Sequence, residues 1–222
     1  LYGLVDLGYS FRLITFEREK WEKEKISKFQ SNLLEQGIEW EPIFTSEKAG
    51  PISPILSLIS GIIAAKRALT PDTGIVHARS FIPGIIARSI TLGTHVKFLN
   101  DIRGFWIDEK VYKGTIRQGG LSYRLGKWLE SWVYSGSDHI VSLTDAAHNA
   151  ISQNRCFKKR PLPSITTIPT CVDTTSFAAK NGVKHSREPL VIGYVGSMGE
   201  GYMPFEIFKV FAKIRERWPD AI

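Results

Sequence analysis

Short runs of branched apolar residues alternate along the chain with longer stretches in which apolar positions recur at helical spacing. The run His139-Ile-Val-Ser-Leu143 is an example, and such runs are typical of strands covered on both faces. Alternation of strands with helices predicts a parallel sheet with helices on both faces, that is, an α/β Rossmann-like doubly wound fold. The strands are expected at residues 11–16, 39–44, 74–78, 96–100, 139–143 and 165–168.

The same alternation starts again near the end of the chain. Residues 190–195 are apolar and predict a buried strand, Gly196 opens a glycine-rich turn, and Pro204 suits the first position of a helix that reaches about Trp218. One face of this helix is expected to carry three apolar side chains, Phe208, Phe211 and Ile214. These elements predict the first unit of a second Rossmann-like domain.

The glycine-rich turn after residue 195 has two interpretations. Free backbone amides at the start of a helix can hold a phosphate group. Many turns between a strand and a helix use glycine only to change direction. The glycine spacing matches neither the dinucleotide-binding fingerprint nor a Walker loop, so both interpretations stay open.

These patterns divide the chain into two domains joined by a linker. Residues 1–176 form the first domain, the polar and weakly patterned residues 177–189 form the linker, and residues 190–222 form the first βα unit of the second domain. We expect the first strand of the sheet to precede residue 1, and further strands of the second domain to follow residue 222.

Polar residues follow several of the expected strands. In an open parallel sheet, ligands bind beyond the carboxyl ends of the strands, so these residues are candidates for a binding site. They are His77, Arg79, Asp101, Arg103, Gly104, Thr144 and Asp173.

Each candidate also has a purely structural interpretation. Asp101 and Arg103 can pair with each other, Thr144 is a good N-cap for a helix over residues 146–153, and His77 can be a half-buried histidine satisfied by the backbone. Asp108 is expected to be an acid at a helix start.

Composition limits the class of protein. The 222 residues are 43% hydrophobic and 23% charged, which is ordinary for a globular protein and argues against disorder. Two cysteines give neither a disulfide framework nor a metal site, which favours a reducing, cytoplasmic compartment. A net charge of +7 favours anionic partners, without choosing among nucleotides, nucleic acid and an anionic bilayer. The basic residues 155–160 are either a solvated loop or a contact with phospholipid headgroups.

The most apolar stretch, residues 52–65, is too short to cross a membrane. We expect a buried helix there, with a helix lying at a membrane interface as the alternative.

The order and wording of the polar motifs resemble glycosyltransferase family 4, the retaining nucleotide-sugar transferases of GT-B architecture. The resemblance spans nearly the whole chain and rests on five motifs. These are Ile75-Val-His-Ala-Arg-Ser80, Asp101-Ile-Arg-Gly-Phe-Trp-Ile-Asp-Glu109, Trp128-Leu-Glu130 with Ser137-Asp-His-Ile-Val-Ser-Leu-Thr144, Ile168-Pro-Thr-Cys-Val-Asp173, and Ile192-Gly-Tyr-Val-Gly-Ser197.

The resemblance implies two Rossmann-like domains with the site between them, and transfer of a sugar to a saccharide or lipid-linked acceptor in surface polysaccharide biosynthesis. It implies that His77 is catalytic, that Gly196 and Ser197 lie beside the donor diphosphate, and that Asp173 lies on the hinge side. The acceptor side would be lined by Arg79, Asp101, Arg103, Gly104 and Thr144. The nucleotide-sugar would be a co-substrate, with no metal or other cofactor and no nucleic-acid partner. The protein would be cytoplasmic, at the inner face of an anionic membrane.

The chain also departs from that family. Gly196-Ser197-Met198 stands where many members have Gly-Arg, and Thr170-Cys-Val-Asp173 stands where many have Asn-Gly-Val-Asp. The paired glutamates of the family are expected beyond Ile222, so we expect these residues alone to give little turnover. Two alternatives remain: a non-catalytic basic α/β module that binds polyanions, and a sugar-nucleotide epimerase of GT-B architecture.

Overall fold

The computed structural model describes residues 1–17, 22–44, 53–154, 161–175, 177, 189–196, 198 and 203–222. The chain divides into two compact units, one of Leu1–Trp106 with Arg124–Pro169 and one of Ile107–Tyr123 with Thr170–Ile222. Most of the linker expected at residues 177–189 lies outside the described residues, as does the basic cluster at residues 155–160.

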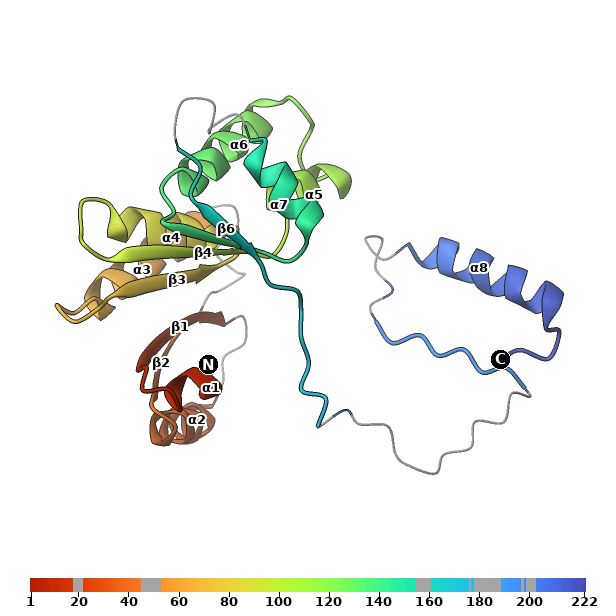
Figure 1. Cartoon of the computed structure of the whole chain (residues 1–222), viewed down its shortest axis with the longest axis horizontal. Coiled ribbons are helices and arrows are strands. Elements are labelled where there is room, and N and C mark those ends of the chain that lie inside the picture. Colours follow the sequence, from red (N-terminus) through yellow and green to blue (C-terminus); the bar gives the residue numbers. More distant parts are fainter. Residues whose placement is uncertain are drawn as a thin grey trace. The chain divides into compact units, whose positions relative to one another are not determined.

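The larger sheet of the first unit has four parallel strands in the order β3-β4-β5-β6 (Figure 1). These strands are Ile75–Arg79, Lys97–Ile102, His139–Ser142 and Ser164–Thr167. The helices that follow or precede them are α3 Ser53–Ala68, α4 Phe81–Thr91, α5 Trp106–Tyr112, α6 Leu121–Tyr134 and α7 Asp145–Ser152. The predicted α/β fold with parallel strands is therefore confirmed.

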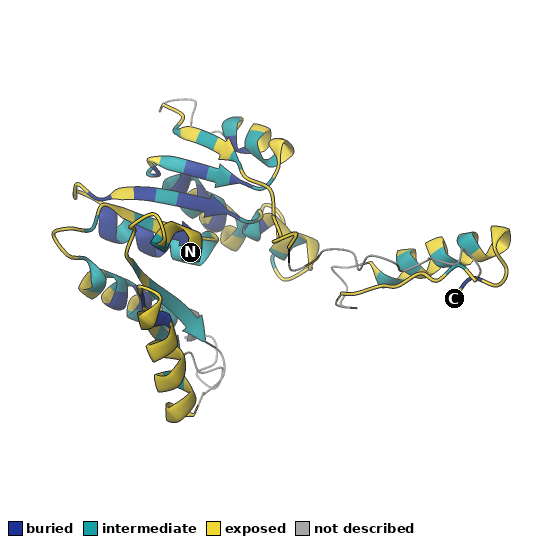
Figure 2. Cartoon of the chain, turned by 60° about the horizontal axis from the view of Figure 1, so that its bottom comes forward, coloured by how far each residue is buried: buried dark blue, intermediate teal, exposed yellow. Residues whose placement is uncertain are grey.

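The core of this unit lies between the sheet and its helices. Buried side chains from β4 and β5 meet buried side chains from α4, α6 and α7, and Figure 2 shows the buried residues gathered in the strands and the helices beside them. Phe98, Val133, Ile140 and Ile151 are each at most 1% exposed. Each such side chain contributes roughly 1.5–3 kcal/mol by leaving water.

A second, smaller sheet pairs β1 Phe11–Glu17 with β2 Ile38–Phe44 in parallel. Its core is formed by Leu33, Ile38 and Trp40 beneath α2 Lys23–Glu35, and the short helix α1 Tyr2–Val5 packs against it through Val5. The sequence predicted one continuous sheet, whereas β1 and β3 do not pair in the structure. Periodicity identifies strands but does not say which strands are neighbours.

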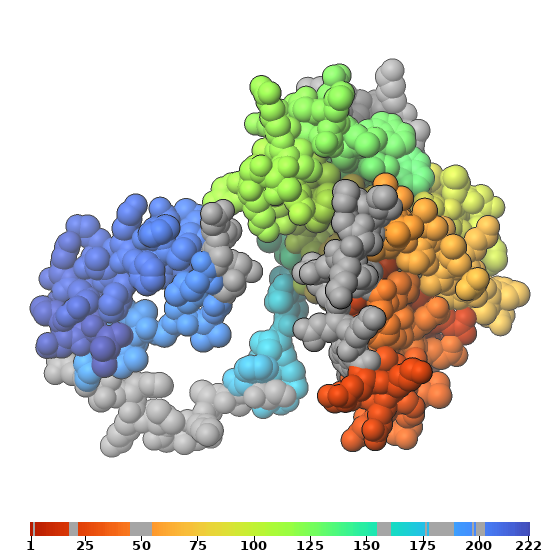
Figure 3. Space-filling view, turned by 180° about the vertical axis from the view of Figure 1, so that it is seen from behind, coloured from red at the N-terminus to blue at the C-terminus, as the bar shows by residue number. Residues whose placement is uncertain are grey.

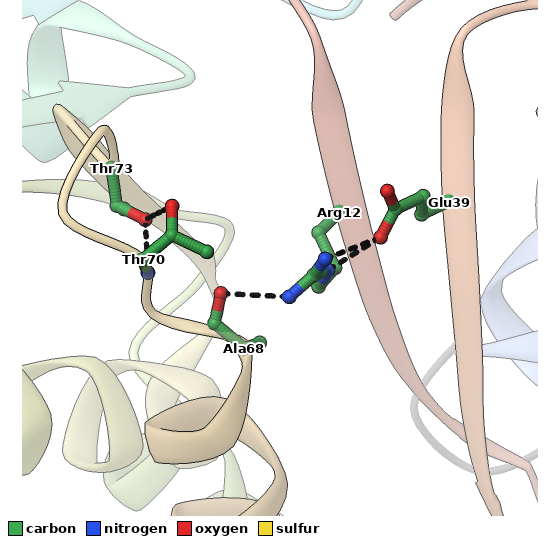
Figure 4. Close-up of polar contacts among 5 residues, drawn as sticks. All are labelled: Arg12, Glu39, Ala68, Thr70 and Thr73. Carbon is green, nitrogen blue, oxygen red and sulfur yellow. Dashed lines mark hydrogen bonds and ion pairs between the residues drawn. The ribbon is translucent and has the colours of Figure 1, made fainter.

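Contacts with α3 hold β1 beside the larger sheet. Arg12 donates to Glu39 on β2 and, over 3.0 Å, to the backbone oxygen of Ala68 at the end of α3 (Figure 4). A Cβ on Gly61, in the middle of α3, would lie 2.6 Å from both Phe16 of β1 and Ile86 of α4. The absence of a side chain at Gly61 therefore lets α3 pack against both elements.

The other side of α3 contradicts the expectation of a buried helix over residues 52–65. Gly61 and Ala64 are buried, but Ile55, Ile59 and Ile63 are 59%, 49% and 45% exposed. The helix is apolar on both sides, and only one side faces the rest of the unit. Among the residues described, no helix is both long and apolar enough to cross a membrane.

In the second unit, the predicted helix is confirmed as α8 Pro204–Arg217. Its least exposed apolar side chains after Pro204 are Ile207, Phe211 and Ile214, whereas Phe208, which we placed on that face, is 57% exposed.

The buried strand predicted at residues 190–195 does not form. These residues carry no strand assignment, and Val195 is fully exposed. In the described part of the unit, their backbone pairs with Ile222, which accepts from the Ile192 amide and donates to the Leu190 oxygen. A run of apolar residues becomes a buried strand only where a neighbouring strand and a covering layer are present.

Candidate functional site

The register of the larger sheet brings two polar strand ends together. Arg79, the last residue of β3, lies opposite Asp101 of β4. The Ser80 amide donates to the Asp101 backbone oxygen over 2.9 Å and so continues this pairing beyond the strand. Because both strands run in the same direction, His77, Arg79, Asp101 and Arg103 gather at one edge of the sheet, as the sequence predicted.

Asp101 is the centre of this cluster. The residue is 8% exposed, and its Oδ2 lies 3.8 Å from His77 Nε2 and 4.0 Å from Arg79 Nε. Its Oδ1 lies 3.8 Å from Arg103 Nη1 and has no hydrogen-bond donor among the described residues. Three nitrogen-bearing side chains, two from β3 and one from the residue after β4, therefore surround one buried carboxylate.

The distances around Asp101 are those of ion pairs without direct hydrogen bonds. A direct N–H···O bond is about 2.7–3.2 Å long, so each of the three pairs is too long by at least half an ångström. A buried acceptor without a donor is costly, about 1–3 kcal/mol. Oδ1 is shielded from solvent, so a ligand hydroxyl can remove this cost only after the surrounding side chains open a path to it. A carboxylate short of donors is a group that a polyhydroxylated molecule can satisfy in that way.

The environment of His77 favours its neutral form. Burial holds the pKa of the His77 imidazole below its usual value, the nearby Asp101 carboxylate raises that pKa in part, and Arg79 lowers it again. A neutral imidazole has one donor and one acceptor nitrogen, so at neutral pH His77 can exchange hydrogen bonds or a proton with a ligand hydroxyl.

Two features of the site were not predicted from the sequence. Ser80 has φ of 79° and ψ of 176°, in a region that non-glycine residues rarely occupy. The rings of Phe81 and Trp106, the first residues of α4 and α5, are stacked with centroids 5.2 Å apart. The sequence shows two aromatic residues after polar strand ends, but it does not show that they meet.

Thr144 and Gly104 follow β5 and β4 at the same edge. The Thr144 hydroxyl accepts a hydrogen bond of 3.1 Å from the Ala147 amide, which confirms its expected role as the N-cap of α7. Gly104 lies in an exposed bend two residues after β4. Asp108 lies in the first turn of α5, as expected.

The remaining candidates belong to the second unit. The Asp173 carboxylate accepts from the amide and hydroxyl of Thr175, over 2.9 and 2.7 Å, and so closes a local turn. A Cβ on Gly196 would lie 2.7 Å from the Tyr194 hydroxyl oxygen, so the ring of Tyr194 closely approaches this glycine. Ser197 lies outside the described residues.

Within the described ranges, no group of three or more His, Cys, Asp or Glu side chains is placed to hold a metal ion. No protein-family model matches the chain, and no curated protein sequence matches it. The chemistry of the cluster around Asp101 is therefore the main structural guide to function.

Proposed function

We propose that the chain is the acceptor-side part of a retaining glycosyltransferase of GT-B architecture, which moves a sugar from a nucleotide-sugar to a saccharide or lipid-linked acceptor. The observation that carries the proposal is the buried Asp101 carboxylate, with one oxygen free to accept, between His77, Arg79 and Arg103 at the carboxyl edge of a parallel sheet. The motif order that resembles glycosyltransferase family 4 supports it independently.

The charges of the cluster suit sugar transfer. When the bond from the sugar to the nucleoside diphosphate breaks, negative charge develops on the departing phosphate, and cationic groups nearby stabilise that transition state. Arg79 is 65% exposed at its side chain and can reach toward such a group, whereas Arg103 is 27% exposed and is held near Asp101.

The proposed roles follow from position. Asp101 accepts a hydrogen bond from a sugar hydroxyl once the side chains around its carboxylate open, and neutral His77 hydrogen-bonds the reacting sugar beside it. The acceptor hydroxyl attacks the sugar carbon from the face that the diphosphate leaves, and its proton passes to the departing phosphate oxygen. We place this reaction in surface polysaccharide biosynthesis, at the cytoplasmic face of a membrane.

Transfer of radiolabelled sugar from a panel of nucleotide-sugars into lipid and saccharide acceptors tests the proposal, with the assay run on the chain joined to a donor-binding domain that supplies the paired glutamates of the family. We expect His77→Ala and Asp101→Asn to reduce transfer by at least about 100-fold, the scale on which the loss of one hydrogen bond to the transition state lowers a rate. His95→Ala and Asp72→Asn are matched controls, because both residues are exposed and precede β4 and β3 at the opposite edge of the sheet.

Transfer that survives both site substitutions would refute the assigned roles. The net charge of +7 favours one competing function, non-catalytic binding of a polyanion. That alternative predicts salt-sensitive binding to heparin and no sugar transfer with any donor.

A further inference from the structure

The exposed side of α3 carries a stripe of large aliphatic side chains. Ile55, Leu56, Ile59 and Ile63 are 59%, 53%, 49% and 45% exposed. At about 100° per residue these four positions fall within an arc of roughly 100° on the helix surface, so they form one continuous apolar stripe. Figure 3 shows α3 (residues 53–68, orange) at the surface of the molecule.

The stripe is not left over from an incompletely packed helix. Gly61 and Ala64, on the opposite side, are buried, and Gly61 closely approaches Phe16 and Ile86. Among the described residues, α3 therefore packs onto the first unit through the side opposite to the stripe. Single exposed apolar residues are common, but a contiguous group indicates a surface that binds a partner.

The charges of α3 indicate the kind of partner. The helix contains no acidic residue, and its last turn carries Lys66 and Arg67. Lys66 falls within the arc that the aliphatic side chains occupy, and Arg67 falls roughly 20° beyond it. An anionic lipid bilayer offers hydrocarbon beneath negatively charged headgroups. Aliphatic residues suit the hydrocarbon, and basic residues in a chain of net charge +7 suit the headgroups.

We propose that the α3 stripe docks the protein on an anionic phospholipid bilayer, with the four aliphatic side chains at the acyl boundary and Lys66 and Arg67 among the headgroups. A further step rests on the proposed function. If the protein transfers sugar, its acceptor is lipid-linked and is reached from the bilayer surface. The direction of α3 is consistent with an acceptor reached from the bilayer. Gly61 in the middle of α3 contacts Phe16 near the end of β1, and Ala68 at the end of α3 accepts from Arg12 near the start of β1. The helix therefore runs antiparallel to β1 and starts near that strand's carboxyl end.

Flotation with lipid vesicles tests the docking directly. We expect the 222-residue chain to float with vesicles of phosphatidylcholine and phosphatidylglycerol, to float far less with phosphatidylcholine alone, and to be released by salt. Each half-exposed isoleucine offers about half of its transfer free energy, so Ile55→Ser and Ile59→Ser should each weaken binding about fivefold. Lys66→Gln and Arg67→Gln should each weaken binding to the anionic vesicles by a similar factor.

A matched control is available on α6. Leu121 and Leu125 are 84% and 59% exposed at the same four-residue spacing as Ile55 and Ile59. The double variant Leu121→Ser/Leu125→Ser should float like the unsubstituted chain, whereas the double variant Ile55→Ser/Ile59→Ser should float far less. Far-ultraviolet circular dichroism should show the same helix content in both double variants.

Three outcomes would overturn the docking proposal. The first is that the chain does not float with anionic vesicles. The second is that the α6 control loses as much vesicle binding as Ile55→Ser/Ile59→Ser does. The third is concentration-dependent self-association that Ile55→Ser/Ile59→Ser abolishes, which would assign the stripe to a protein interface. Failure of the proposed function is seen separately, because Asp101→Asn should float normally whether or not the protein transfers sugar.

Discussion

Replacing Asp101 by asparagine should weaken the binding of a proton by His77. The Asp101 Oδ2 lies 3.8 Å from His77 Nε2. Two unit charges at that distance attract by about 1 kcal/mol at the dielectric constant of water and by about 4 kcal/mol at an effective constant of 20. The His77 side chain is 49% exposed, which favours the lower figure, so the proton affinity of His77 should fall about fivefold.

The measurement is a titration of the His77 ring by NMR, following its Cε1 proton from about pH 5 to pH 8. In the unsubstituted protein, burial already holds the pKa of His77 below its ordinary value, and Asp101 opposes that effect. The pKa of His77 should therefore fall further in Asp101→Asn. It should rise in Arg79→Gln, because the guanidinium of Arg79 lowers it.

A pKa of His77 that stays the same or rises in Asp101→Asn would show that the carboxylate does not face the imidazole, and the cluster described above would then be wrong.

Three further substitutions test the elements that position the site. Thr144→Ala removes the hydroxyl that accepts from the Ala147 amide and should lower the free energy of unfolding by about 1 kcal/mol, whereas Thr144→Ser should preserve it, as measured by urea denaturation. Gly136→Ala places a Cβ against the Arg88 side chain and should cost about 2 kcal/mol in the same assay, most of which Arg88→Ala on that background should restore. An unchanged midpoint for Gly136→Ala would contradict the close packing of Arg88 on Gly136. Ser80→Gly should raise the melting temperature by several degrees, because glycine accepts a φ of 79° at little cost; a lower melting temperature would argue that the serine side chain stabilises this turn.

The sequence predicts best those features that depend on residues close together in the chain. The six strands of the first unit and the N-cap at Thr144 appear where expected, because hydrophobic periodicity and capping chemistry act over a few residues. The gathering of His77, Arg79, Asp101 and Arg103 was also predicted, since parallel strands place their carboxyl ends at one edge of a sheet.

Features that depend on distant partners were not predictable in the same way. Residues 190–195 have the composition of a strand, yet the structure assigns no strand to them, and Leu190 and Ile192 pair through the backbone with Ile222. The separate sheet of β1 and β2 and the exposed side of α3 have the same origin, because an apolar pattern does not identify what covers it. Whether an apolar segment is buried depends on which distant segments pack against it, and the local sequence does not contain that information.

The size of the apolar stripe limits what kind of membrane association it can support. Four half-exposed aliphatic side chains on α3 offer about 4 kcal/mol, and Lys66 and Arg67 add about 2 kcal/mol on an anionic surface. A total of about 6 kcal/mol corresponds to a partition constant of roughly 10⁴ M⁻¹, which is comparable to one myristoyl chain and is reversible. A protein held this weakly leaves and rejoins the bilayer freely. If both proposals hold, the stripe would bring the cluster around Asp101 to one lipid-linked acceptor after another without anchoring the protein permanently.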